Sequence, residues 1–261
     1  MDMAREPATL SYGASFYGEI AAGSFRSALI VLPLVFDIVH PCSVIDVGCG
    51  VGTWLRAARA LGVADLCGID GSHVPQHLLE IDSGEFNGRD LTQPLGHTTR
   101  RYDLALSLEV AEHLPRSRAD SFVSDLCGLA DAVLFSAAIP GQGGQEHINE
   151  ERQSVWAERF VRHGFQPIDV VRPAVWSNSD VEYWYQQNTI LYVANTRSDL
   201  LASARTAATH NPPLFDVVHP TPWGTTKAAF HAEVHSQPGL RLALQRTRDA
   251  TRNAIRERLH W

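Results

Sequence analysis

Residues 44–53, V-I-D-V-G-C-G-V-G-T, constrain the fold of this 261-residue chain more than any other segment. An apolar run typical of a β-strand leads into glycines at alternate positions 48, 50 and 52. Glycine lets the backbone turn sharply and lets a ligand lie against the main chain. A helical pattern begins at Thr53, so the segment predicts a strand, a tight turn and a helix. A ligand at the turn is the favoured interpretation, and a tight turn without a ligand is the alternative.

The chain continues this alternation of strands and helices as far as residue 197. The expected strands are Ser43–Val47, Leu66–Asp70, Phe86–Asp90, Tyr102–Ser107, Ala132–Ala138, Gln166–Val171 and Thr189–Ala194. Amphipathic stretches at Thr53–Leu61, Ser117–Leu129 and Glu151–His163 are expected to be helices. Such alternation predicts an α/β fold with a Rossmann-like, seven-stranded, mostly parallel sheet flanked by helices on both faces. Loops and ligands are then expected at the carboxyl ends of the strands.

Three parts are expected along the chain. Residues 1–42 read as an apolar helical cap, residues 43–197 as the α/β domain, and residues 198–261 as a C-terminal extension. The extension ends in an Arg-rich helical pattern at residues 239–261, which most often means a solvated face. It is also suited to a dimer contact or to an anionic substrate.

Charge and cysteine usage exclude several classes of protein. The formal net charge is −7, which argues against a large nucleic-acid interface. The four cysteines form no C-x-x-C pair, which favours a reducing, cytoplasmic setting. The N-terminus lacks a signal-peptide pattern, and the apolar stretch Ala28–Val39 is expected to be too short for a membrane span.

The glycine pattern separates three kinds of nucleotide site. A dinucleotide fold requires G-x-G-x-x-G, but Thr53 occupies the position of the third glycine, and the Gly-Lys-Ser/Thr of a P-loop is absent. The pattern Asp-x-Gly-x-Gly-x-Gly resembles motif I of the class I S-adenosylmethionine-dependent methyltransferases. The resemblance extends over about residues 40–195 and includes Y-D-L-A-L-S-L-E-V-A-E-H-L-P after the third strand.

The resemblance implies a set of residues that bind S-adenosylmethionine. The glycine loop and the acidic residues at the strand ends supply most of the binding residues. Asp70 is expected to accept hydrogen bonds from the ribose hydroxyls, and Asp90 is expected to accept one from the adenine amino group. A dinucleotide fold predicts an acid at the position of Asp70 too, so that residue alone does not discriminate. The guanidinium of Arg26 suits the carboxylate of the donor, with a solvated helix face as the alternative. The full expected set is Arg26, Asp46, Gly48, Cys49, Gly50, Asp70, Gly71, Asp90, Leu91 and Glu109.

A carboxylate and histidine cluster follows the fourth strand. If a helix begins at Glu109, then Glu109, Glu112 and His113 share one helix face. The Glu-x-x-Glu-His pattern with a distant histidine resembles metal-dependent O-methyltransferases, such as the small-RNA 2′-O-methyltransferases and the ubiquinone-pathway enzymes. The resemblance implies a divalent cation, Mg, Mn, Fe or Zn, held by Glu109, Glu112, His113 and His147. The ion would lower the pKa of the substrate hydroxyl.

Three alternatives to the metal site remain open. Glu109 can face the donor while His113 only holds the loop. His147 or His113 can act as general base without a metal, which suits N- or C-methylation. The segment His147–Glu150 can bind substrate without taking part in the chemistry. The candidate catalytic residues are therefore Glu112, His113 and His147.

The segment 176–188 combines four aromatic side chains with amides, which suits a sugar, another planar or amphipathic acceptor, or a subunit interface. Together with the loop I-P-G-Q-G-G-Q-E-H-I-N-E it resembles a bacterial branch of methyltransferases associated with glycans and secondary metabolites. The expected substrate contacts are Asn149, Glu150, Trp176, Tyr183 and Trp184. The sequence thus predicts O-methylation of a small-molecule acceptor, in a monomer or homodimer. A non-catalytic, donor-binding regulatory partner is the alternative from another class.

Overall fold

The computed structural model describes residues 14–96, 100–209 and 215–221, and side chains from residue 22 onward. The chain divides into two compact units, Met1–Val218 and His219–Trp261. Most of the second unit, including the Arg-rich segment 239–261, lies outside the described residues. The three-part division expected from the sequence stays a prediction, and the fold described below is that of the first unit.

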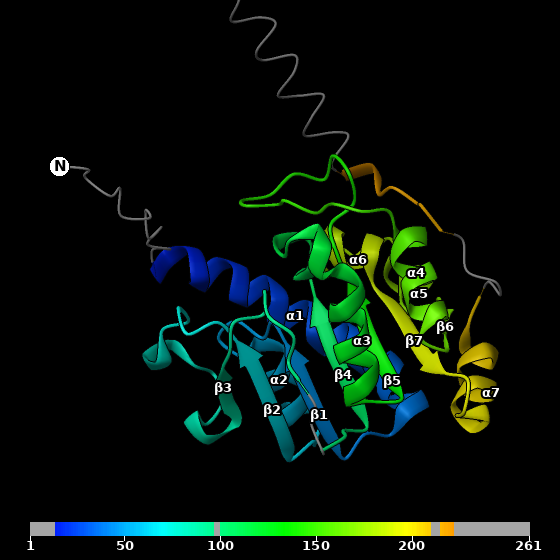
Figure 1. Ribbon diagram of the computed structural model, residues 1–261, viewed down its shortest axis with the longest axis horizontal. Helices are drawn as coiled ribbons and strands as arrows, with labels where there is room; N and C mark the ends of the chain where they lie inside the picture. The colour runs from blue at the N-terminus through cyan, green and yellow to red at the C-terminus, as the bar shows by residue number, and fades with distance from the viewer. Residues whose placement is uncertain (1–13, 97–99, 210–214, 222–261) are drawn as a thin grey trace, which may run out of the picture. The chain divides into compact units, whose positions relative to one another are not determined.

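A seven-stranded sheet forms the centre of the first unit (Figure 1). Its strands are β1 (Ser43–Val47), β2 (Asp65–Asp70), β3 (Phe86–Gly88), β4 (Leu104–Leu108), β5 (Ala132–Ser136), β6 (Phe165–Ile168) and β7 (Ile190–Ala194). Their order is β3-β2-β1-β4-β5-β7-β6. All neighbouring pairs are parallel except those of β7, which is antiparallel to both β5 and β6. The expected mostly parallel, seven-stranded α/β fold is therefore confirmed.

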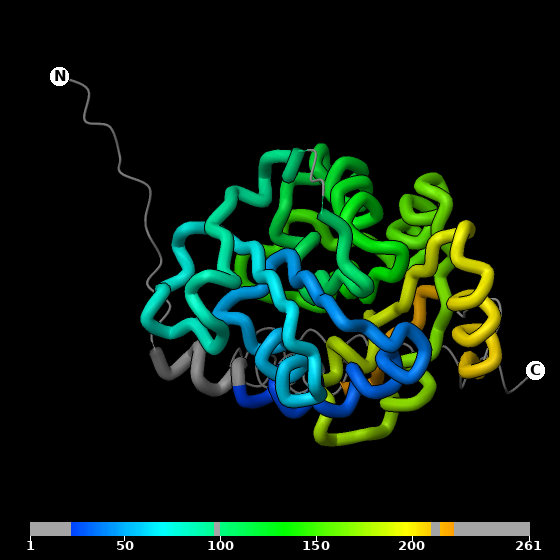
Figure 2. The backbone as a smooth tube through the Cα atoms, turned by 90° about the horizontal axis from the view of Figure 1, so that it is seen from below, coloured from blue at the N-terminus to red at the C-terminus, as the bar shows by residue number. Residues whose placement is uncertain are grey.

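Helices cover both faces of the sheet, as the two views show (Figures 1 and 2). One face packs against α1 (Ala14–Val39), α2 (Thr53–Ala60), α5 (Arg172–Val175), α6 (Tyr183–Asn188) and α7 (Ser198–Ala207). The other face packs against α3 (Ala119–Leu129) and α4 (Gln153–Arg162). Short 3-10 turns lie at Gln76–Leu78, Ser83–Glu85, Ala111–His113 and Arg116–Arg118. Strands buried on both sides explain the continuous apolar runs in the sequence.

Glycines begin and end α2. Gly52, at φ 90°, precedes the helix, and Gly62, at φ 101°, follows it. The N–H of Val63 donates to the carbonyl of Ala58, and that of Gly62 donates to the carbonyl of Arg59. This is the hydrogen-bond pattern of a left-handed glycine C-cap. The turn and the helix after β1 are therefore fixed locally by glycine.

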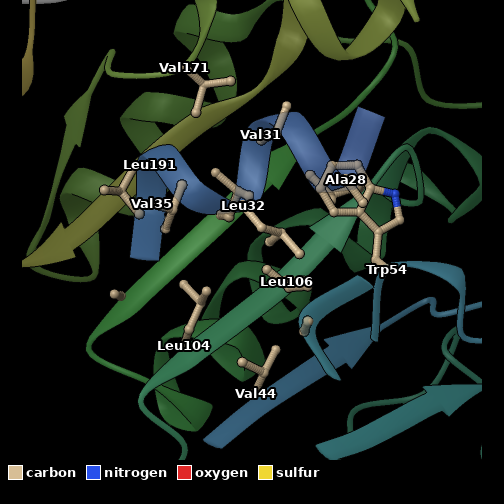
Figure 3. Packing of buried hydrophobic residues seen from close by; sticks show 14 of the residues in the cluster. Ala28, Val31, Leu32, Val35, Val44, Trp54, Leu104, Leu106, Val171 and Leu191 are labelled. Carbon is tan, nitrogen blue, oxygen red and sulfur yellow. The ribbon is translucent and has the colours of Figure 1, made fainter. Parts of the chain in front are cut away.

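The helix α1 is an integral part of the core. Ala28, Val31, Leu32 and Val35 are fully buried, and they lie against Leu104, Leu106 and Leu191 of the sheet (Figure 3). Within the described residues, Ala22–Val39 is long and apolar enough to span a membrane, with 44% of the segment buried in the protein. This segment is longer than the stretch Ala28–Val39 considered above and meets this condition by length and composition only, while its buried face is that of a core helix.

Two local expectations are wrong. No helix begins at Glu109, because this residue has φ +56° and the following turn is the 3-10 segment Ala111–His113. The expected ends of two strands also differ from the structure. The strand β3 ends at Gly88 and β5 ends at Ser136, each two residues earlier than expected. The Asp90 side chain accepts from Thr92 and so turns the chain away from the strand direction.

Candidate functional site

The glycine turn lies between the carboxyl ends of β1 and β4. A Cβ on Gly48, at φ +88°, would collide with Val110, so the segment after β4 packs directly on the turn. A Cβ on Gly50, at φ +54°, would meet no atom within 4 Å. Gly48 therefore has a packing role, whereas Gly50 presents bare main chain to open space, which suits a ligand.

Two acidic side chains support this turn. The carboxylate of Asp70 accepts from the backbone N–H groups of Gly50 and Gly71, each at 2.6 Å, and so joins the turn to the end of β2. Asp46 is buried within β1, and desolvation, with a smaller contribution from the charge of Asp70, raises its pKa to about 7. Cys49 is also buried. The structure therefore brings the expected Asp46, Cys49 and Asp70 together beneath and beside the turn.

The expected adenine position lies at the end of β3. Asp90 is exposed, and hydrogen bonds from the hydroxyl and N–H of Thr92 lower its pKa. Leu91 is buried, and its carbonyl accepts from the buried guanidinium of Arg118, which also pairs with Asp125. Arg118 therefore fixes this segment, and the sequence analysis gave no role to it.

Arg26 lies on the exposed side of α1. Its guanidinium is 3.7 Å from the carboxylate of Glu182, just before α6. The ion pair links the two helices. Contact between Arg26 and the donor carboxylate stays a prediction.

A second group of polar side chains follows β4 and β5. One potential ligand atom from each of Glu112, His113 and His147 lies within 4.8 Å of the others. The two imidazole rings meet edge to face, with their centroids 4.9 Å apart. Three of the four expected metal ligands are thus adjacent, although His147 is distant in sequence from Glu112 and His113.

The carboxylate of Glu112 is buried with little compensation, because the backbone N–H groups of Glu112 and Ala138 only partly oppose the rise in its pKa. The side chain is fully buried, and neither oxygen has a hydrogen-bond partner of normal geometry. Desolvation, followed by the negative charge of Glu109, raises its pKa well above the usual range. Desolvation also lowers the pKa of His113, and the neighbouring His147 adds to this effect. A poorly compensated buried carboxylate is costly, so its placement beside two imidazoles indicates a binding or catalytic site.

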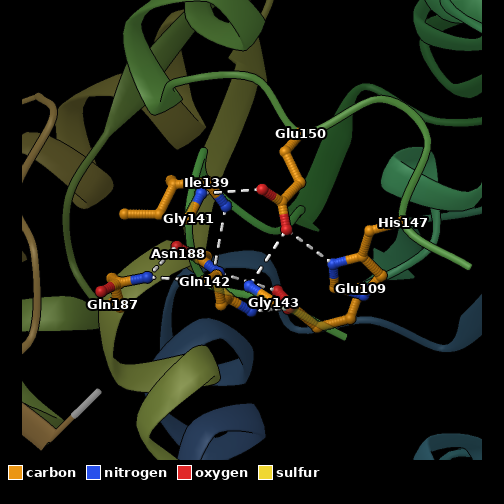
Figure 4. Close-up of polar contacts among 9 residues, drawn as sticks. All are labelled: Glu109, Ile139, Gly141, Gln142, Gly143, His147, Glu150, Gln187 and Asn188. Atoms are coloured by element: carbon orange, nitrogen blue, oxygen red, sulfur yellow. Dashed lines mark hydrogen bonds and ion pairs between the residues drawn. The ribbon is translucent and has the colours of Figure 1, made fainter. Parts of the chain in front are cut away.

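The loop after β5 holds His147 by a carboxylate (Figure 4). Glu150 accepts from the N–H groups of Gly141, at 2.8 Å, and Gly143, at 3.1 Å, and it pairs with Nδ1 of His147 at 2.9 Å. Asn149 is buried and donates to the carbonyl of Ala111. The structure thus uses Glu150 and Asn149, both expected substrate contacts, to hold the loop.

Glu109 is separate from this group, contrary to the expected four-ligand set. Its two oxygens accept from Nε2 of Gln142, at 2.9 Å, and Nδ2 of Asn188, at 3.1 Å (Figure 4). Burial raises its pKa, while these hydrogen bonds oppose the rise. The sequence analysis did not identify Gln142 or Asn188 as site residues. The signal that could have found Asn188 is the run of amides, Q-Q-N, directly before an apolar strand.

The aromatic segment begins as a turn and ends in the helix α6. Trp176, Tyr183 and Trp184 are half-buried, and the rings of Tyr183 and Trp184 meet at a centroid distance of 5.1 Å. Tyr185 is buried, with its hydroxyl 3.1 Å from Oγ of Ser24 and 3.4 Å from Nε1 of Trp54. Among the described aromatic side chains of this segment, Trp176, Tyr183 and Trp184 are therefore more exposed than Tyr185.

Comparison with known proteins agrees with this geometry. Residues 21–122 match a family described as a methyltransferase domain. No curated protein matches the sequence. Among solved structures, the plantazolicin methyltransferase BpumL in complex with a monoazolic analogue and SAH has a TM-score of 0.51 and 14% identity. The match covers 70% of this chain and 88% of that chain.

Two further structures have lower TM-scores. Magnesium protoporphyrin IX methyltransferase (ChlM) from Synechocystis PCC 6803 with bound SAM has a TM-score of 0.45 and 22% identity, over 70% of this chain and 86% of that chain. The methyltransferase domain of the bacterial protein CtHen1-CN has a TM-score of 0.45 and 18% identity, over 64% of this chain and 97% of that chain. At 14% identity, the BpumL structure indicates a shared fold only.

Proposed function

We propose that this chain, of which residues 21–122 match a methyltransferase domain, transfers the methyl group of S-adenosylmethionine to an oxygen of a small-molecule acceptor. Glu112, His113 and His147 would hold a divalent cation, which would supply Lewis-acid assistance to the transfer. The observation that carries this proposal is the buried carboxylate of Glu112, which lacks hydrogen-bond partners and lies beside two imidazoles.

The donor set fits a divalent cation. A carboxylate without partners supplies negative charge, and a lowered pKa keeps His113 neutral, which is the form that binds metal. The contact of Glu150 with Nδ1 of His147 fixes that ring, as second-shell carboxylates do for metal-bound histidines. When bound, the cation would lower the pKa of the acceptor hydroxyl. Mixed oxygen and nitrogen ligands suit Mg, Mn, Fe or Zn.

The glycine turn and Asp70 support the assignment of the donor. The donor sulfonium is already reactive, so the protein mainly has to align the acceptor oxygen with the methyl group. The turn and the histidine group both lie at the carboxyl ends of neighbouring strands, where they can hold the two reactants together. Trp176, Tyr183 and Trp184 offer aromatic faces for a sugar-containing or planar acceptor, which favours a glycan or secondary metabolite.

A substitution at the glycine turn tests the donor site. Gly50→Ala is expected to weaken the binding of S-adenosylhomocysteine (SAH), the demethylated donor, more than about tenfold, because the new methyl group occupies the open space. The matched control is Gly62→Ala, which also has positive φ and open surroundings but lies beyond the far end of α2. Both variants should lose about 1–2 kcal/mol of stability through backbone strain. Isothermal titration calorimetry that finds equal SAH affinity in both would contradict the placement of the donor.

A metal-free mechanism is the second candidate. The pairing of Nδ1 of His147 with Glu150 at 2.9 Å leaves Nε2 to take a proton, as in a general base oriented by a carboxylate. This arrangement suits N- or C-methylation.

Turnover of labelled donor distinguishes the candidates. Purified protein is incubated with labelled S-adenosylmethionine and hydroxylated acceptors or pathway extracts, with and without chelator. We expect transfer to oxygen, loss of transfer with chelator, and recovery with one of the four metals. Transfer that is indifferent to chelator would favour the metal-free candidate. SAH binding without transfer to any acceptor would favour a regulatory, donor-binding partner.

A further inference from the structure

A chain of buried amides ends at the carboxylate of Glu109. Asn188 and Gln142 donate to its two oxygens directly. Behind them, Nε2 of Gln187 donates to Oε1 of Gln142 and Oδ1 of Asn188, each at 3.0 Å, and Nε2 of Gln153 lies 3.4 Å from Oδ1 of Asn188. Gln153, Gln187 and Asn188 are all buried. We call Gln142, Gln153, Gln187 and Asn188 the amide chain.

The amide chain has a direction. Each of these hydrogen bonds runs from an amide N–H toward Glu109 or toward an amide that itself donates to Glu109. Nε2 of Gln153 also donates to the carbonyls of Gln187 and Val217. The side chain of Asn188 also donates to Oε1 of Gln142 at 2.8 Å, which joins the two final donors. Dipoles aligned in this way stabilise negative charge on the carboxylate and fix its orientation. The chain thus favours an oriented anion at Glu109.

Glu109 lies next to the expected donor site. It directly precedes Val110, whose side chain fills the space beside Gly48 in the glycine turn. The charge of Glu109 also contributes, after burial, to the raised pKa of Tyr183 in the aromatic segment. Glu109 therefore lies next to the residue that packs on the turn, and its charge acts on a ring of the aromatic segment.

The donor and its product differ in charge at one atom. S-adenosylmethionine carries a positive sulfonium, whereas SAH carries a neutral thioether, and both retain the ammonium and carboxylate groups. An oriented anion in a site of low dielectric attracts a nearby cation more strongly than it would in water. A carboxylate near the sulfur would therefore favour the donor over the spent product.

On the basis of the proposed function, we propose that Gln142 and Asn188 are positioning residues that orient the Glu109 carboxylate toward the donor sulfonium. The site thereby selects the charged donor against its neutral product. The orientation acts through hydrogen bonds at both oxygens of Glu109. This role for Glu109 is an alternative to its expected role as a metal ligand.

Affinities for the two ligands provide the test. Gln142→Met and Asn188→Leu remove the amide donors, and each should lower the ratio of S-adenosylmethionine affinity to SAH affinity about tenfold. SAH affinity itself should change little. The matched control is Gln186→Met, because Gln186 is a buried amide of the same helix that donates to the carbonyls of Asn178 and Val181 instead. Its ratio should equal that of the unaltered protein.

The two variants differ in their structural risk. Gln142 lies on a half-exposed loop, so Gln142→Met is expected to fold even if the buried Asn188→Leu does not. Equal weakening of both ligands would mean that Glu109 contacts a group common to them, such as the ammonium, and would overturn the proposal. An unchanged ratio in folded Gln142→Met would also overturn it. Failure of the unaltered protein to bind either ligand would instead contradict the proposed function.

Discussion

Glu112→Met is expected to reduce methyl transfer about a thousand-fold and at the same time to stabilise the protein. The loss follows from removal of the carboxylate that would hold the cation, since a bound metal contributes several kcal/mol to such a reaction. The gain in stability follows because the side chain is fully buried and its oxygens lack hydrogen-bond partners. Methionine fills a similar volume without a polar group, so the free energy of unfolding should rise by about 2 kcal/mol.

Turnover of labelled donor and thermal unfolding without added metal measure the two effects. Glu85→Met is the control, because Glu85 pairs with Arg59 at 2.5 Å outside the site. This control should keep its methyl-transfer activity. Its unfolding temperature should fall or stay the same, but should not rise. Full activity in Glu112→Met would remove Glu112 from the chemistry. A lower unfolding temperature in Glu112→Met would show that its carboxylate is compensated in solution.

The strands and the glycine turn could be predicted because their signals are local. The strands β1, β4, β5 and β7 are short, mostly apolar runs, and β1 was expected with the bounds that the structure has. The approach of Asp70 to the turn was also predictable, because parallel strands bring their carboxyl ends to one edge. Local patterns of this kind depend on backbone periodicity alone.

The role of Glu109 could not be predicted, because its contacts are long-range. The helix expected from the sequence would have put Glu109 on one face with Glu112 and His113. The positive φ of Glu109 is incompatible with a helix that begins there. Its partners, Gln142 and Asn188, are 33 and 79 residues away along the chain. Gln142 lies in the quoted glycine-rich loop without a role assigned to it, and only the packing of α6 against the loop after β5 reveals that it and Asn188 contact Glu109. Spacing therefore identifies the ends of strands well, and it identifies partners from other loops poorly.

Gly144→Ala is expected to reduce methyl transfer about a hundred-fold while SAH affinity stays within about twofold. A Cβ at this position would overlap the imidazole of His147, whose Nε2, Cε1 and Cδ2 atoms lie on that side. The ring cannot move freely, because Glu150 holds Nδ1 at 2.9 Å and the ring of His113 packs against it. The methyl group must therefore displace His147, and changes that disturb metal-bound histidines commonly cost up to about a hundred-fold.

Gly143→Ala separates this steric effect from backbone strain in the same loop. Gly143 has φ +71°, and a Cβ there would meet no atom within 4 Å. Its N–H, which donates to Glu150, is retained in alanine. Gly143→Ala should thus cost about 1–2 kcal/mol of stability and preserve most of the turnover. Equal loss of turnover in both variants would mean that the conformation of the whole loop controls the reaction. Loss of turnover in Gly144→Ala alone, with a shifted imidazole signal in NMR spectra, would show that the position of His147 causes the loss.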